Sequence, residues 1–217
     1  MSRMLLPLMF GLIAVLNSCS SVGSTPSVGQ DKQQGAALVD SWIQKLHSAD
    51  GNERQAAKSA ILSLANESAQ SRQYAVKELI RIAKVPNGCI EVLTSNERFS
   101  EWDAATDILG TLKAPEAIAA LTETLDCSKA TSLSLDSYPA AKAIAKIGRE
   151  AVPQLAAALD HKPVRVRFVA AQALYRIGGE EAKAALIKAQ GKETDKVVAN
   201  MIKDMLRDWS SRGHSGI

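Results

Sequence analysis

The amino-acid sequence predicts an all-α fold, a right-handed superhelical array of about five helix pairs. The first observation is composition: of 217 residues, 46% are hydrophobic and 23% are charged, which is typical of a globular protein. Alanine and leucine dominate and aromatic residues make up only 4%, which favours helices over a β-sandwich or barrel. The second is a set of apolar residues that recurs at fixed offsets, and the third is Pro and Gly at helix ends. A net charge of +3 is too small to indicate nucleic-acid binding.

The recurring set is clearest near the C-terminus, with Leu159, Ala170, Leu174 and Ile177 at offsets 0, 11, 15 and 18. Counted from the anchors Leu46, Leu93, Leu125 and Gln190, the other copies are Ala57, Ile61 and Leu64; Ala104, Ile108 and Thr111; Ala140, Ile144 and Ile147; and Met201, Met205 and Asp208. The copy that follows Leu125 runs four residues late, which predicts an insertion within residues 127–138. The anchors are 47, 32, 34 and 31 residues apart, and the long first spacing predicts an extra helix at 68–84.

Each copy is expected to form a helix, a short turn and a second helix. In the clearest unit we expect these helices at about 150–160 and 163–177. Pro153 and Pro163 then stand in first turns, where a missing N–H costs nothing, and Gly178 suits the position just after a helix end. Small alanines on the shared face allow neighbouring helices to approach closely.

The clearest unit resembles the HEAT repeat, and in particular the short HEAT-like repeats named after phycobilisome lyases. The resemblance rests on the segments AVPQLAAAL and AAQALYRIG, on Asp160, and on Val166 followed by Arg167. It extends over residues 36–210 and is strongest at 137–190. Armadillo and tetratricopeptide arrays are competing interpretations, although the tetratricopeptide signature residues are missing.

The resemblance also implies that Asp and Arg side chains pair within and between repeats. Arg54 occupies in the first unit the position that Arg167 has in the clearest one. Glu101 and Ser137 stand there in the second and third units, so a continuous arginine ladder is not expected.

The N-terminus is typical of an exported protein. Arg3 precedes an apolar run at residues 4–16, which is too short to cross a bilayer as a helix but suits a signal peptide. A buried core helix is the alternative interpretation. We therefore expect residues 1–18 to be a cleaved signal.

The sequence LNSC at residues 16–19 resembles the lipobox of bacterial lipoproteins, which implies that Cys19 is acylated and becomes the first residue after cleavage. Ordinary secretion is the alternative. Ser20, rather than Asp, follows the cysteine, so the outer membrane is favoured if the source is Gram-negative. Residues 19–35 are predicted to be a lipid-anchored flexible tether, 36–210 the repeat domain and 211–217 a disordered tail.

Signatures of catalysis are missing from the sequence. His47 and His161 fall in predicted turns and His214 in the polar tail, so all three are expected to be solvated. No nucleophile elbow, phosphate-binding loop, dinucleotide fingerprint, zinc-protease motif or CxxC is present. We therefore expect no enzymatic activity, no metal, no cofactor and no small-molecule substrate.

Cys89 and Cys127 are expected to be separate buried thiols. Both are assigned to first helices of adjacent units, but at registers six residues apart, which is about 9 Å along a helix axis. A disulfide needs about 5.5–6 Å between Cα atoms. Trp42, Trp102 and Trp209 are predicted to be core or capping residues, with Trp209 covering the last unit.

The second helices are expected to line the concave surface of the array, as the HEAT resemblance implies. Positions 1, 2, 5 and 6 residues after each recurring alanine, or after Met201 in the last copy, are then exposed; six of these twenty are basic and none is acidic. Tyr175, Ile202 and Leu206 add apolar contact area. The candidate partner-binding residues are Lys142, Lys146, Tyr175, Arg176, Lys203, Leu206 and Arg207. They predict a groove for an acidic protein partner; the alternative is a solvated face whose cations favour helix C-termini.

The leading functional hypothesis is a non-catalytic, lipid-anchored cell-envelope protein that acts as a protein-interaction scaffold. A second hypothesis is an enzyme resembling the bilin lyases and isomerases that share this repeat, which the export signal opposes. A third is a soluble exported binding module without lipid.

Overall fold

The computed structural model describes residues 28–212 apart from residues 87 and 131–132. The helices are α1 (Val28–Lys45), α2 (Gly51–Glu67), α3 (Ala69–Ala83), α4 (Cys89–Leu93), α5 (Asn96–Thr111), α6 (Ile118–Glu123), α7 (Pro139–Ile147), α8 (Val152–Ala158), α9 (Val164–Ile177), α10 (Gly179–Gln190) and α11 (Lys196–Arg212). Short 3-10 helices are η1 (Pro115–Ala117), η2 (Leu135–Ser137) and η3 (Arg149–Ala151). The expected signal peptide, Cys19, His214 and residues 213–217 lie outside the described residues.

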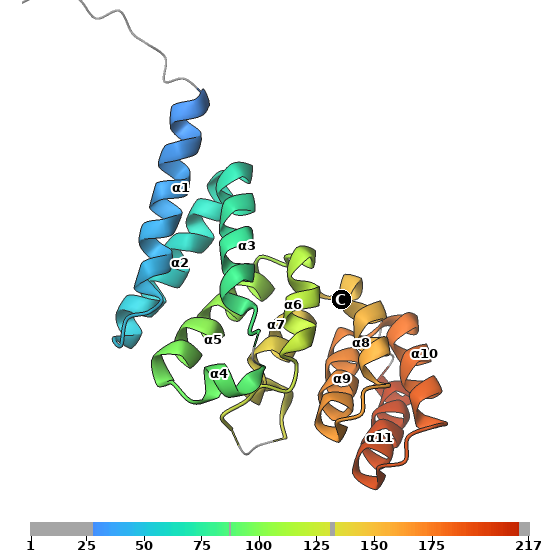
Figure 1. Ribbon diagram of the computed structural model, residues 1–217. Coiled ribbons are helices and arrows are strands. Elements are labelled where there is room, and N and C mark those ends of the chain that lie inside the picture. Colours follow the sequence, from blue (N-terminus) through green and yellow to red (C-terminus); the bar gives the residue numbers. More distant parts are fainter. Residues whose placement is uncertain (1–27, 87, 131–132, 213–217) are drawn as a thin grey trace, which may run out of the picture.

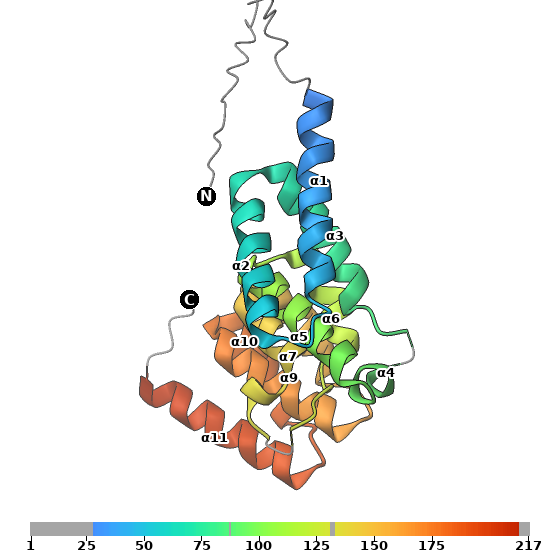
Figure 2. The same cartoon turned by 90° about the vertical axis from the view of Figure 1, so that its left-hand side faces the viewer.

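The helices form two layers that run the length of the molecule (Figures 1 and 2). The first-helix layer consists of α1, α3, α6, α8 and α10, and the second-helix layer of α2, α5, α7, α9 and α11, with each helix packed on the next of its own layer. The short helix α4 packs on α5. The prediction of an all-α, HEAT-like helical solenoid is therefore confirmed.

The helical part of the chain is longer at both ends than the sequence predicted. Helix α1 begins at Val28, so residues 28–35, which were expected in the flexible tether, are helical. Helix α11 continues to Arg212, two residues into the expected tail. None of the described helices combines the length and apolar character that a bilayer-spanning segment requires.

The extra helix expected at 68–84 is confirmed as α3, and it serves as the first helix of the second unit. Ser68 begins it, because its hydroxyl accepts a hydrogen bond from the backbone N–H of Ser71. The segment around Leu93 forms only the five-residue helix α4, since Pro86 and Gly88, with its positive φ of 71°, precede it.

The core follows the recurring apolar positions in four of the five units. Leu174, at the centre of the clearest unit, is fully buried. The recurring alanines Ala57, Ala140 and Ala170 are also fully buried, and Ala104 is nearly so. The closest approach is between α5 and α7, where a Cβ on Gly110 would lie 2.7 Å from the Cα of Ala143. Gly110, which was expected on the exposed face, is therefore buried because only a glycine admits the neighbouring backbone.

The register of the last unit was wrong. Met201 and Met205 are half-buried, whereas Val198, Ile202 and Trp209 form the buried stripe of α11. Asp195 begins this helix by accepting hydrogen bonds from the N–H groups of residues 197 and 198. Ile202 was expected to be exposed; it is buried because Val198, Ile202 and Trp209, at i, i+4 and i+11, form a more apolar stripe than two methionines and an aspartate. Trp209 covers the last unit, as expected.

Two arginines hold equivalent turns in the first and fourth units. Arg54 donates to the carbonyls of Ser48 and Ala49 at 2.6 and 3.0 Å, and Arg167 donates to those of residues 161 and 162 at 3.0 and 2.8 Å. The implied Asp–Arg pairing does not occur between Asp160 and Arg167, because Arg167 binds Glu193 and Asp160 binds Lys192 instead.

His47 and His161 lie in turns, as predicted, although His47 Nδ1 is 3.3 Å from the buried Glu101 carboxylate.

The expectation of two separate thiols is wrong, because Cys89 and Cys127 form a disulfide with a Cα–Cα distance of 5.2 Å. The predicted spacing assumed that both residues belong to long, adjacent helices. Instead Cys89 starts the short α4, and Cys127 lies beyond the end of α6. Neither residue is therefore held at the helical register that would keep the two apart.

Candidate functional site

A groove of about 900 Å³ lies where three successive second helices, α5, α7 and α9, end. We call it the inter-repeat groove; its lining residues are Gly110, Thr111, Lys113, Lys142, Ala145, Lys146, Ile147, Gly148, Arg149, Glu150, Arg176 and Ile177. After each helix end the chain turns toward the first-helix layer. Gly148 and Gly178 make two of these turns at φ 99° and 74°, and Lys113 makes the third at φ 50°.

The structure brings three of the seven candidate partner-binding residues to this groove: Lys142, Lys146 and Arg176. Lys146 and Arg176 lie on the last turns of α7 and α9, where the carbonyl ends of the helices favour cations, and Lys142 lies one turn before Lys146. The other four candidates, Tyr175, Lys203, Leu206 and Arg207, do not line it. The expected single basic wall therefore divides into this groove and a separate surface of α11.

Tyr175 is a structural contact of the last unit rather than an open anchor. Its hydroxyl donates a hydrogen bond to Asp208, and its ring meets that of Trp209 edge-on at 5.6 Å between centroids. On α11, Leu206 packs against the core, and Arg207 pairs with Asp204 at 3.0 Å. The sequence could not reveal these contacts because the partners come from outside the expected basic face.

Acidic side chains reach the basic face from positions that the sequence analysis assigned elsewhere. Asp107 lies three residues after Ala104, at an expected core position, yet it binds Lys58 at 2.5 Å and Lys146 at 2.6 Å. Arg176 is 3.4 Å from Asp136, in the predicted insertion. The prediction that the basic face contains no acidic side chain is therefore wrong, because Asp107 and Asp136 contact its cations in the folded structure.

The Asp107 carboxylate joins three units. Desolvation alone would raise its pKa, but hydrogen bonds from Lys146 and Lys58 outweigh that effect, and the pKa lies below its ordinary value. Lys146 also contacts the hydroxyl of Thr111 at 3.2 Å. Asp107 thus stays ionised at neutral pH and takes up much of the charge of Lys58 and Lys146.

Three cations remain for a ligand in the inter-repeat groove. Among the described residues, none of Lys113, Lys142 and Arg149 forms an ion pair, and Glu150 is the acidic residue that lines the groove with them. Ala145, Ile147 and Ile177 supply apolar surface to the same groove. Lys113 and Arg149 were not among the predicted partner-binding residues, although each stands nine residues after a recurring alanine, a repeat signal that could have identified both.

The insertion within residues 127–138 packs against α9. The Ser128 hydroxyl donates to the carbonyl of Ser137 at 2.5 Å and closes the base of the loop. The Gln172 amide donates to the carbonyl of Leu133 at 2.8 Å. The insertion therefore covers part of the second-helix surface, beside the groove.

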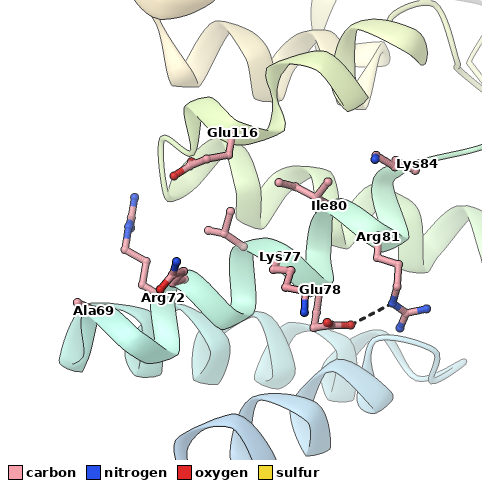
Figure 3. A pocket seen from close by; sticks show the side chains of 10 residues that line it. Ala69, Arg72, Lys77, Glu78, Ile80, Arg81, Lys84 and Glu116 are labelled. Carbon is pink, nitrogen blue, oxygen red and sulfur yellow. Dashed lines mark hydrogen bonds and ion pairs between the residues drawn. The ribbon is translucent and has the colours of Figure 1, made fainter. Parts of the chain in front are cut away.

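A second groove of about 810 Å³ runs along α3 in the first-helix layer (Figure 3). Val76 and Ile80 supply apolar surface, and Glu116 faces α3 from η1. Arg72, at one end of the groove, donates a hydrogen bond to the carbonyl of Leu112 and so ties α3 to the turn after α5. Lys77, Arg81 and Lys84, with Glu78, line the same groove farther along α3 (Figure 3).

One grouping of potential metal ligands occurs among the described residues: the ligand atoms of Cys89, Asp126 and Cys127 lie within 4.8 Å of one another. Both sulfur atoms are joined in the disulfide, which removes them from coordination. Asp126 then remains as a single carboxylate ligand, so the oxidised grouping does not have the donor set of a metal site.

A family model described as HEAT repeats matches residues 138–207, a segment that reaches from α7 into α11. It includes the Lys142, Lys146, Arg149 and Arg176 side of the inter-repeat groove. No curated protein matches the chain. HEAT repeats commonly mediate protein–protein interactions, so the match supports a protein partner in general.

Proposed function

We propose that this chain is a non-catalytic scaffold of the bacterial cell envelope, anchored through acyl chains on Cys19, and that it binds an acidic segment of a partner protein in the inter-repeat groove. One observation carries the proposal: Lys113, Lys142 and Arg149 line the groove together with apolar side chains and lack ion pairs within the described part of the chain. Such an arrangement suits carboxylates flanked by apolar side chains.

The disulfide supports an extracytoplasmic location, because disulfides persist in oxidising compartments and are rare in the cytosol. The order of apolar N-terminus, cysteine and polar segment is the order that a lipoprotein requires. Replacing Cys19 by Ala should abolish metabolic labelling with a fatty acid. A wild-type chain without label, or a labelled Cys19→Ala variant, would contradict the anchor.

The groove is tested separately with a fluorescent peptide of alternating Glu and Ala, by fluorescence anisotropy. The Lys113→Glu, Lys142→Glu, Arg149→Glu variant should lose most of the binding, and the wild-type affinity should fall with added salt. A matched control variant reverses the charges of three basic residues that are exposed and lie outside the groove, by the substitutions Arg165→Glu, Lys188→Glu and Lys196→Glu. Equal binding by the two variants, at equal helicity, would refute the groove.

A further inference from the structure

Three basic side chains form an exposed stripe along α3. Lys77, Arg81 and Lys84, which we call the α3 stripe, are spaced at i, i+4 and i+7, and all three are exposed. Arg81 pairs with Glu78 at 3.0 Å (Figure 3) but keeps 73% of its side chain exposed. Within the described residues neither lysine forms an ion pair.

The α3 stripe differs in its charge from the other helices of the first-helix layer. Helices α6 and α8 contain no Lys or Arg, and α10 balances two lysines with two glutamates. The excess positive charge is therefore concentrated on the one helix of this layer that packs directly against α1.

Helix α1 connects the stripe to the proposed anchor. The first turns of α3 lie beside the middle of α1, which extends beyond them (Figure 1): a Cβ on Gly35 would lie 2.9 Å from the Ser71 hydroxyl, and the Tyr74 hydroxyl donates to Asp40 at 2.9 Å. Val28 follows Cys19 by nine residues, a length with an r.m.s. span of roughly 15–18 Å for a flexible chain. Acyl chains on Cys19 would hold α1 and α3 near the bilayer.

We propose that the α3 stripe binds the anionic headgroups of the membrane that holds the lipid anchor, so that the array lies against that membrane by α1 and α3. This inference rests on the proposed anchoring. Lys77 and Lys84 form no ion pair among the described residues and Arg81 is held only by Glu78 of the same helix, so these long exposed side chains suit mobile headgroups better than a fitted protein surface. Each Lys or Arg near an anionic surface strengthens binding on the order of fivefold.

The test uses the chain without residues 1–18, with Cys19→Ser, so that it keeps every described residue but carries no lipid. Cosedimentation is measured with phosphatidylcholine vesicles and with vesicles that also contain phosphatidylglycerol. Lys77→Glu, Arg81→Glu, Lys84→Glu should reduce binding to the anionic vesicles by roughly 100-fold. The Lys113, Lys142 and Arg149 charge-reversal variant has the same change in net charge and should bind nearly as well as the unsubstituted chain.

Binding that requires the anionic lipid, disappears at high salt and is lost only in the α3 variant would support the proposal. Equal binding to both kinds of vesicle, or equal loss in the two charge-reversal variants, would overturn it. Loss of acidic-peptide binding in the α3 variant, without vesicle binding by the unsubstituted chain, would assign the stripe to a protein partner and also overturn it. Fatty-acid labelling of Cys19 is measured independently, so failure of the anchor and failure of the stripe give different results.

Discussion

Removal of the Arg167 side chain should test how the last two units are joined. Arg167 donates two hydrogen bonds to Glu193, at 2.8 and 2.7 Å, and the exposed fractions of the two side chains are 13% and 4%. Breaking a buried pair costs about 3–5 kcal/mol, whereas exposed pairs contribute at most about 1 kcal/mol. In Arg167→Ala, the remaining carboxylate can take up a proton; from an ordinary pKa of 4.5 this costs about 3.4 kcal/mol at pH 7. Because the adjoining turn is open to water, we expect a loss of about 2–3 kcal/mol.

The destabilisation caused by Arg167→Ala should depend on pH, because the pKa of Glu193 depends on Arg167. Hydrogen bonds from Arg167 hold the pKa of Glu193 below its ordinary value, despite desolvation. In the wild-type protein the stabilisation by Glu193 is therefore present above the unfolded pKa and is lost as pH falls through the folded pKa. Without Arg167, desolvation is opposed only by the backbone N–H groups of residues 194 and 195, so the pKa of Glu193 rises from its value in the wild-type protein. The destabilisation caused by the substitution should therefore be smaller at pH 5 than at pH 7.

Urea unfolding, followed by far-ultraviolet circular dichroism and by Trp209 fluorescence, measures both values. Arg165→Ala is the matched control, since Arg165 is an exposed arginine on the same first turn of α9. Its substitution should change the free energy of unfolding by no more than about 0.5 kcal/mol. A loss below about 1 kcal/mol for Arg167→Ala, or an equal loss at both pH values, would refute the reasoning.

Three further substitutions test the packing. Leu174→Ala should cost about 2–5 kcal/mol by urea unfolding, because the side chain is fully buried; a cost below about 1 kcal/mol would contradict the assigned core. Gly110→Ala should destabilise by about 1–3 kcal/mol, despite the better helix propensity of alanine, because its Cβ would meet the Ala143 backbone at 2.7 Å; a higher melting temperature would contradict this close approach. Cys89→Ser with Cys127→Ser should lower stability by about 2–4 kcal/mol, since the disulfide closes a separation of 38 residues, and reducing agent should then have no further effect on the melting curve.

Local physics explains why the repeat could be predicted from sequence. The spacing of Ala170, Leu174 and Ile177 places them on one helix face wherever that helix packs, and Pro163 and Gly178 restrict the backbone at its two ends without tertiary help. The helix at 68–84 followed from the long spacing between the first two anchors, Leu46 and Leu93. These features depend on neighbours along the chain, so they are visible in the sequence.

The candidate site depended on contacts between units, which periodicity does not encode. Lys142, Lys146 and Arg176 come together because three helices end side by side, but the position of Asp107 between Lys58 and Lys146 follows from the packing of α5 against its neighbours. A single insertion or a short helix between two units changes the distances between side chains of those units.

The sequence by itself determined the helical repeat, its core positions in four of the five units and the cations on the last turns of α7 and α9, because these follow from the 3.6-residue period and from helix-end chemistry. Only the tertiary structure decided that Cys89 meets Cys127, that Tyr175 binds Asp208, and which cations of the inter-repeat groove form no ion pair among the described residues. The reason is that such pairings join residues more than thirty positions apart. Their distances are fixed by how helices stack, which no local pattern in the chain records.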